Sequence, residues 1–232
     1  NLNEPKTPEL NVSVSLESRV LRLESELMKL QEIVKQLNKG SGETPGESKI
    51  VKYLQDEQNR LEQDYQKIQI ISDTDDIGKL ITIAEALKTI KSFEIDVLRL
   101  GRKVIPEHRV IKTHTQSLAI GFLQINGTPF TTRIKNYNEL VISHKDIRFI
   151  LLRDCRQPVI KGGVGKQEIE KLQNTVNGDF ILINKEDRIR FELIYKLITD
   201  IQNKDFEMEL ERALNILIAK LSDYWLIQIF SQ

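Results

Sequence analysis

The stretch SLAIGFLQI, residues 117–125, decides the fold class of this chain because it is an almost continuous apolar run. Two similar runs follow it, RFILLRD (148–154) and DFILI (179–183). The segments 127–144, 166–176 and 185–202 separate or follow these runs and have apolar residues at helical spacing. Continuous apolar strands that alternate with helices are typical of a parallel sheet covered on both faces. We therefore expect an α/β domain over residues 107–232, with a small, mainly parallel sheet flanked by helices.

A last helix is expected over residues 207–230, at the end of this domain. Apolar residues lie around much of its circumference, including Leu210, Leu214, Leu217 and Trp225. A helix of this kind has no broad polar face for solvent, so it must pack heavily against the domain or against a partner.

The N-terminal part of the chain has a different, heptad pattern. Spacings of four and three residues relate Leu16, Val20, Leu23, Leu27, Leu30, Val34 and Leu37, and a second stripe contains Val51, Leu54, Gln58, Leu61, Tyr65 and Ile68. The glycine-rich linker NKGSGETPGES (38–48) separates the two stripes. We expect an antiparallel, coiled-coil-like helical hairpin over residues 14–72, preceded by a flexible lead-in over 1–13. Pairing of this region with a second copy is the open alternative.

Residues 73–106 are expected to form a helix that connects the hairpin to the α/β domain. The acidic stretch SDTDD (72–76) places Ser72 or Asp73 at its N-cap, and Pro106 lies just beyond its end. The stripe of this helix extends from Ile77 to Leu98.

Composition limits the classes of function. The 232 residues contain 34 basic and 34 acidic side chains, so no net charge attracts the whole molecule to nucleic acid or to an anionic membrane. Cys155 is the only cysteine, which excludes an internal disulfide, and no apolar run is long enough to span a bilayer. We expect a cytoplasmic chain, without a membrane partner, that is a fragment or a subunit of a larger complex.

The glycine-rich stretch KGGVGK (161–166) resembles the deviant Walker A loop of partition-type ATPases. That resemblance implies a phosphate bound by backbone N–H groups and by Lys166. However, Gln167 stands where the family has a hydroxyl residue for magnesium, and the motif lies too late in the chain for the remaining strands of such a domain. We therefore interpret the stretch as a strand-to-helix connection near the carboxyl ends of the strands.

The same connection could still bind an anion or another ligand. Its charged residues are Arg153, Asp154, Arg156, Lys161 and Lys166, close to the start of the next helix. Ligands of open parallel sheets gather beyond the carboxyl ends of the strands, and a helix N-terminus favours negative charge.

A second candidate surface is basic. The stretch that contains Arg99, Arg102, Lys103, Arg109 and Lys112 is the densest in positive charge, and these residues are candidates for contacts with nucleic-acid phosphates. No aromatic residues are interleaved with them, so a platform for stacking single-stranded bases is not expected.

No complete catalytic or metal-binding set is apparent. His108, His114 and His144 have no zinc-ligand spacing, and the strands lack the acid followed by acid-x-Lys of a restriction-nuclease-like site. We expect no metal and no cofactor. The favoured interpretation is a non-catalytic module for protein interaction or assembly, which contacts protein partners or a second copy through the hairpin and the last helix. The alternatives are a nucleic-acid-associated or nuclease-like factor, and an enzyme that binds phosphate or nucleotide at residues 153–166.

Overall fold

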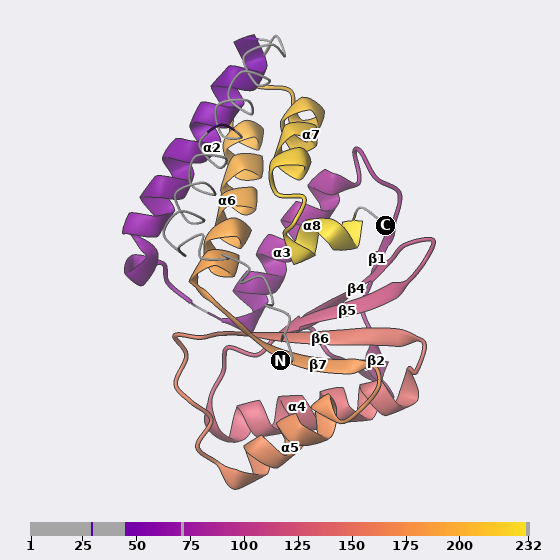
Figure 1. Cartoon of the computed structure of the whole chain (residues 1–232). Coiled ribbons are helices and arrows are strands. Elements are labelled where there is room, and N and C mark those ends of the chain that lie inside the picture. Colours follow the sequence, from indigo (N-terminus) through magenta and orange to yellow (C-terminus); the bar gives the residue numbers. More distant parts are fainter. Residues whose placement is uncertain (1–28, 30–44, 71, 231–232) are drawn as a thin grey trace, which may run out of the picture. The chain divides into compact units, whose positions relative to one another are not determined.

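The computed structural model describes Lys29 and residues 45–70 and 72–230 (Figure 1). Residues 46–232 form one compact unit, separate from residues 1–45. In chain order its elements are α2 (Pro45–Gln63), a 3-10 turn (Tyr65–Lys67), α3 (Asp73–Leu87), β1 (Glu94–Asp96), β2 (Arg99–Leu100), β3 (Lys103–Val104), β4 (His108–Lys112), β5 (Ser117–Phe122), α4 (Gly127–Ser143), β6 (Ile147–Asp154), α5 (Gly163–Gln173), β7 (Gly178–Ile183), α6 (Lys185–Gln202), α7 (Leu210–Lys220) and α8 (Trp225–Phe230).

The main sheet is mixed, with strand order β1-β4-β5-β6-β7. The three apolar runs form β5, β6 and β7, and these strands pair in parallel. By contrast, β4 pairs antiparallel with both β1 and β5. The expectation of a mainly parallel sheet was therefore wrong, because two further strands come from residues 94–112. Those strands are short and carry charged residues such as Glu94, Asp96 and Lys112, so they produce no apolar run.

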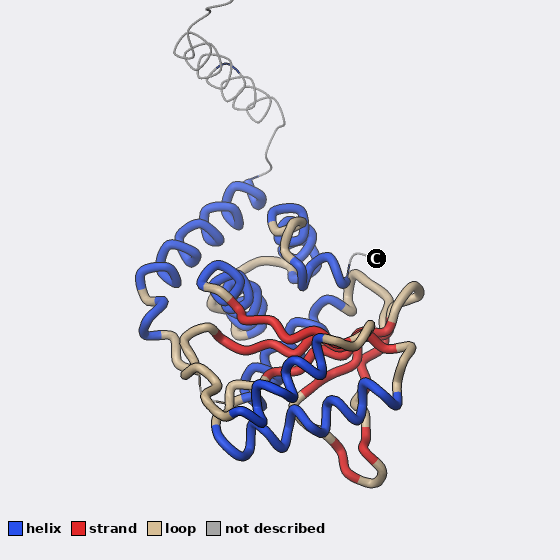
Figure 2. The backbone as a smooth tube through the Cα atoms, turned by 60° about the horizontal axis from the view of Figure 1, so that its bottom comes forward, coloured by secondary structure: helices blue, strands red, loops and turns tan. Residues whose placement is uncertain are grey.

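Helices cover both faces of this sheet (Figures 1 and 2). The crossover helices α4 and α5 lie on one face. The chain moves from β5 to β6 to β7 in the same direction across the sheet, and two right-handed crossovers in the same direction place their helices on the same face. On the other face lie α3, α6 and α8, with α2 and α7 packed beyond them. Alternate residues of β6 enter the two cores: Phe149 and Leu151 pack beneath α4 and α5, whereas Ile150 and Leu152 face the other group of helices.

The connecting helix is shorter than expected. It ends at Leu87, so its expected extension to residue 106 was wrong, and the strands β1 to β4 lie within residues 94–112 instead. At its start, the Ser72 side chain accepts a hydrogen bond from the backbone N–H of Asp75, as the N-cap prediction requires. Beyond the helix, Gly101 has a φ of 59° in the β2–β3 turn, a left-handed conformation that ends any helical path.

The second heptad stripe lies mostly on α2, with Tyr65 and Ile68 in and after the 3-10 turn, and α2 packs within the compact unit. Leu54 is fully buried and Leu61 nearly so, in the same core as residues of α6 and α7. The Tyr53 hydroxyl donates to the Asp200 carboxylate of α6 at 2.7 Å, and its ring centroid lies 4.4 Å from that of Phe206. The hairpin over residues 14–72 is thus not confirmed. All residues of the first stripe, and linker residues 38–44, lie outside the described residues.

The C-terminal helix expected over residues 207–230 is divided into α7 and α8. The division follows Leu221, whose backbone leaves the helical region with φ −109° and ψ 29°. Because each short helix buries its own face, including Leu214 and Leu217 on α7 and Leu226 on α8, apolar residues occur all around the predicted single helix. Across the described residues, no helix is long and apolar enough to cross a membrane.

Candidate functional site

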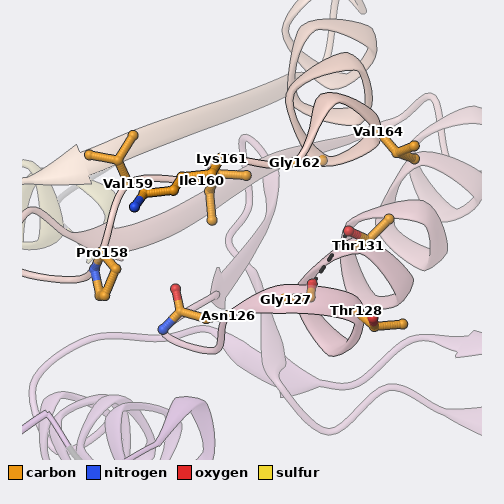
Figure 3. Close-up of a pocket in the computed structure, with 11 residues that line it drawn as sticks. Asn126, Gly127, Thr128, Thr131, Pro158, Val159, Ile160, Lys161, Gly162 and Val164 are labelled. Atoms are coloured by element: carbon orange, nitrogen blue, oxygen red, sulfur yellow. Dashed lines mark hydrogen bonds between the residues drawn. The ribbon is translucent and has the colours of Figure 1, made fainter.

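A cavity of about 700 Å³ lies at the carboxyl ends of β5 and β6 (Figure 3). One wall is the start of α4, with Asn126, Gly127, Thr128 and Thr131. The facing wall is the β6–α5 connection, from Pro158 to Gly162 and on to Gly165. Much of the glycine-rich stretch that the sequence singles out therefore lines this cavity.

Two helix N-termini border this cavity. The N-cap residues are Asn126 for α4 and Gly162 for α5, and neither supplies a side-chain capping hydrogen bond. The first N–H groups of a helix have no partner within it, and they carry a partial positive charge. Lys161 adds a full positive charge, and the eleven lining residues include no Asp or Glu. The electrostatics of the cavity therefore favour an anionic ligand.

The glycines of this region have different structural roles. Gly127 has a φ of 68°, a conformation that other residues adopt only with strain. A Cβ atom on Gly165 would lie 2.9 Å from the Ile160 Cγ2, so close packing requires a glycine there. A Cβ atom on Gly162 or Gly163 would meet nothing within 4 Å. Packing thus does not explain these two glycines, of which Gly162 lines the cavity.

The buried Arg153 side chain connects the two walls of the cavity, because it donates to Asn126 on one wall and to Pro158 on the other. Arg153 is the residue before the end of β6, and only 2% of its surface is exposed. Its guanidinium donates to the carbonyl oxygens of Leu123, Ile125 and Pro158 and to the side-chain oxygen of Asn126, at 2.5 to 2.9 Å. Four internal acceptors therefore occupy the guanidinium of this predicted anion-binding residue.

Asp154 and Arg156 form an ion pair beneath the connection. The Arg156 guanidinium contacts both Asp154 oxygens, at 2.9 and 3.0 Å, and also donates to the Tyr65 and Ile68 carbonyl oxygens. Burial alone would raise the pKa of Asp154, but the hydrogen bonds and charge of Arg156 lower it overall. Asp154 therefore remains a charged carboxylate paired with Arg156. Because Arg156 already contacts both of its oxygens, Asp154 is poorly suited to act as a general base or as a metal ligand.

The Asp154–Arg156 pair belongs to a larger buried charge network on the α3 and α6 side of the sheet. Arg188 of α6 is fully buried and lies 2.9 Å from Asp76, 2.9 Å from Glu192 and 3.8 Å from Asp154. The Gln124 amide bridges two members, since it donates to Asp76 at 2.8 Å and accepts from the Asp154 N–H at 2.9 Å.

Two further basic residues extend this network towards α3 and α4. Lys79 pairs with Glu192 at 2.9 Å. Arg133 contacts both Asp73 and Glu107. Opposite charges thus compensate each of these buried groups, and the network holds the ends of β5 and β6 against α3, α4 and α6.

Sequence reasoning missed this network. Asp73 and Asp76 lie in the acidic stretch expected to begin a helix, and Arg188 lies in the segment 185–202, for which the sequence predicts only helical spacing. A signal was present, because Arg188 and Glu192 are one helical turn apart and lie among the apolar residues Ile189, Phe191 and Leu193 of α6.

The other predicted binding residues are dispersed. Lys161 lines the cavity, whereas Lys166 is exposed in the first turn of α5 and is not among the lining residues. Arg99, Arg102 and Lys103 share the exposed β2–β3 hairpin. On β4, Arg109 donates to the Pro106 and His108 carbonyls, and Lys112 pairs with Asp96 at 2.8 Å. The structure thus groups three of the five basic residues, and their contact with nucleic acid stays a prediction.

The histidines do not form a common site. His108 is fully buried, and its Nε2 accepts a hydrogen bond from the Leu98 N–H at 3.0 Å, so the imidazole is neutral. Burial lowers its pKa to about 4. Within residues 45–70 and 72–230, no group of three His, Cys, Asp or Glu side chains is placed to hold a metal ion.

Comparison with known proteins adds no relative: no protein-family model, curated protein or solved structure matches this chain significantly.

Proposed function

We propose that this chain is a non-catalytic assembly module that associates with a second copy of itself through residues 16–37. The observation that carries the proposal is the position of α2. Most of its stripe, which the antiparallel hairpin would require as a partner, packs in the core of residues 46–232: Leu54 and Leu61 are buried there, although Val51 is 37% exposed. The heptad stripe of residues 16–37 therefore needs another partner, and an identical stripe on a second copy supplies one.

The residue types in this stripe favour two parallel strands. When Val20 is assigned to heptad position a, the a positions hold Val20, Leu27 and Val34, and every d position from residue 16 to residue 37 holds leucine. β-Branched residues at a with leucine at d favour parallel dimers. In that arrangement Arg19 at position g faces Glu24 at position e of the second copy, and the two-fold symmetry makes this favourable pair twice.

The charge network supports the non-catalytic part of the proposal. Three acids near the carboxyl ends of β5 and β6, Asp73, Asp76 and Asp154, are each paired with an arginine. The other polar side chains of the cavity are hydroxyls, an amide and one ammonium group, which suit binding rather than bond cleavage.

Sedimentation equilibrium of the full chain tests the assembly. The wild type is expected to sediment at twice its 26.9 kDa mass, and Leu27→Glu is expected to sediment as a monomer because it places two carboxylates in the seam. The matched control is Lys29→Glu, at an exposed position outside the seam, which should keep the dimer. A wild type that remains monomeric at high concentration would contradict the proposal.

The cavity favours a second candidate function, which is binding of a phosphate or carboxylate group. Its support is the convergence of two uncapped helix N-termini and Lys161 on a cavity that has no acidic lining residue. Calorimetric titration with inorganic phosphate and pyrophosphate tests it. Lys161→Ala should weaken binding, whereas Lys166→Ala should not, since Lys166 does not line the cavity. Loss of binding in Lys166→Ala alone would instead favour the Walker-like interpretation.

A further inference from the structure

The two edges of the main sheet differ in how well they resist pairing with another strand. At one edge, β1 has only three residues, and two of them, Glu94 and Asp96, are exposed acids. At the other edge, β7 has six residues, GDFILI, with one charged residue and no proline. Short, charged edge strands prevent association, whereas long apolar ones promote it. The β7 edge is therefore the open one.

Among residues 45–70 and 72–230, some backbone groups of β7 along this edge have no hydrogen-bond partner in another strand. The carbonyls of Asn177, just before β7, and of Ile183 accept bonds from Phe149 of β6 and from Cys155 just after it, so odd-numbered residues of β7 direct their backbone groups towards β6. Since this direction alternates along a strand, Gly178, Phe180 and Leu182 direct their N–H and C=O groups outward. The Phe180 carbonyl accepts only a long bond, 3.4 Å, from the exposed Gln173 amide, which an incoming strand can displace.

Apolar side chains flank the edge on both faces of the sheet. Leu182 is 58% exposed and lies on the α4 and α5 face, and Ile181 is 42% exposed on the opposite face. Ile181 also borders a groove of about 290 Å³ whose apolar lining includes Ile183 and, from α8, Trp225 and Ile229. Exposed apolar residues beside unpaired backbone groups indicate an interaction surface.

We infer that β7 pairs antiparallel with β7 of a second copy, so that the two five-stranded sheets join into one. The strand is complementary to itself about a two-fold axis at Ile181. In this register, Phe180 faces Leu182 of the second copy as a hydrogen-bonded pair, and the two Ile181 side chains meet beside the groove. Asp179, the only charged residue of β7, faces Ile183 of the second copy, so the two carboxylates stay apart.

This inference rests on the proposed self-association through residues 16–37. Six residues of edge strand form a small interface, and two free copies would pair weakly. If a coiled coil already joins the two copies, their β7 strands pair within one complex. The effective concentration of one β7 strand near the other is then high, which strengthens the pairing. The same second copy then occupies both surfaces.

Amide hydrogen exchange of the full chain tests the pairing. In the wild type, at concentrations where sedimentation shows the dimer, the Phe180 and Leu182 amides should exchange about tenfold more slowly than in monomeric Leu27→Glu. The Ile181 amide faces β6 in both states, so it is the internal reference. Equal exchange of the Phe180 and Leu182 amides in dimer and monomer would overturn the edge pairing while leaving the proposed function intact. A monomeric wild type would overturn both.

A pair of variants provides a second readout. Leu182→Lys places a charge on the edge, and it should raise the dimer dissociation constant about tenfold or more. Ile142→Lys is the matched control, because Ile142 on α4 is also 58% exposed but is part of neither β7 nor the groove beside it. Equal dissociation constants for these two variants would contradict the inference.

Discussion

Replacement of Arg188 by methionine is the most direct test of the buried charge network. Methionine keeps most of the length of the side chain but removes its charge. Asp154 would retain Arg156, and Glu192 would retain Lys79. Asp76, with 1% of its surface exposed, would retain only the Gln124 amide. The variant therefore leaves one buried carboxylate without a cation.

The expected loss of stability follows from that uncompensated charge. Removing one partner of a buried ion pair costs about 3–5 kcal/mol. This amount is a large share of a stability that is on the order of 5–15 kcal/mol for a typical protein. Urea denaturation followed by circular dichroism measures the change, provided that the slope with urea is the same in both proteins.

Two further variants separate this mechanism from loss of packing. The double variant Arg188→Met/Asp76→Asn removes the uncompensated charge, so it should recover most of the lost stability, because an apolar or neutral replacement of a whole buried pair is tolerated. Arg190→Met, two residues away on α6, breaks pairs with the exposed acids Glu186 and Asp223 and should cost less than about 1 kcal/mol. If Arg188→Met cost no more than Arg190→Met, or if Asp76→Asn gave no recovery, the reasoning would be refuted.

Three other predictions test the core, the histidine and the glycines. Leu54→Ala should lower the free energy of unfolding by about 2–5 kcal/mol in urea titrations, since Leu54 is fully buried; a loss below about 1 kcal/mol would mean that α2 is not docked. The folded-state pKa of His108, about 4, lies below its unfolded value, so stability should fall by roughly 3 kcal/mol as pH decreases from about 6.5 to 4. His108→Gln should lack that component, and an identical pH profile would contradict it. Gly165→Ala should lower the thermal midpoint through its contact with Ile160, whereas Gly163→Ala should not, and equal midpoints would contradict the packing argument.

The sequence predicts the parallel half of the sheet closely, and the reason is physical. Strands buried on both faces are continuously apolar, so the runs beginning at residues 117, 148 and 179 correspond to β5, β6 and β7 within two or three residues at their ends. The edge region fails the same test, because β1 and β4 are short and carry charges. Hydrophobic periodicity alone therefore extended α3 across residues that form strands.

The sequence predicts the position of the candidate site in the fold, but not the contacts of its side chains. The sequence indicates the connection after β6, and the structure places a cavity there. What it cannot show is the direction of each charged side chain, which depends on partners distant along the chain. Arg153 contacts residues near 125, and Arg156 contacts the carbonyl oxygens of Tyr65 and Ile68.

The direction of these side chains changes what the charge of the connection can do. Four basic residues lie around the glycines, but Arg153 and Arg156 are directed inward, where carbonyl oxygens and Asp154 accept their hydrogen bonds. Arg153 thus holds the two walls of the cavity together, and Arg156 holds the 3-10 turn after α2 against the end of β6. The positive potential at the cavity arises instead from Lys161 and from the backbone of two helix starts. A ligand bound there would contact backbone groups beside Lys161, and Gly162, which no packing contact requires to be glycine, is among the lining residues.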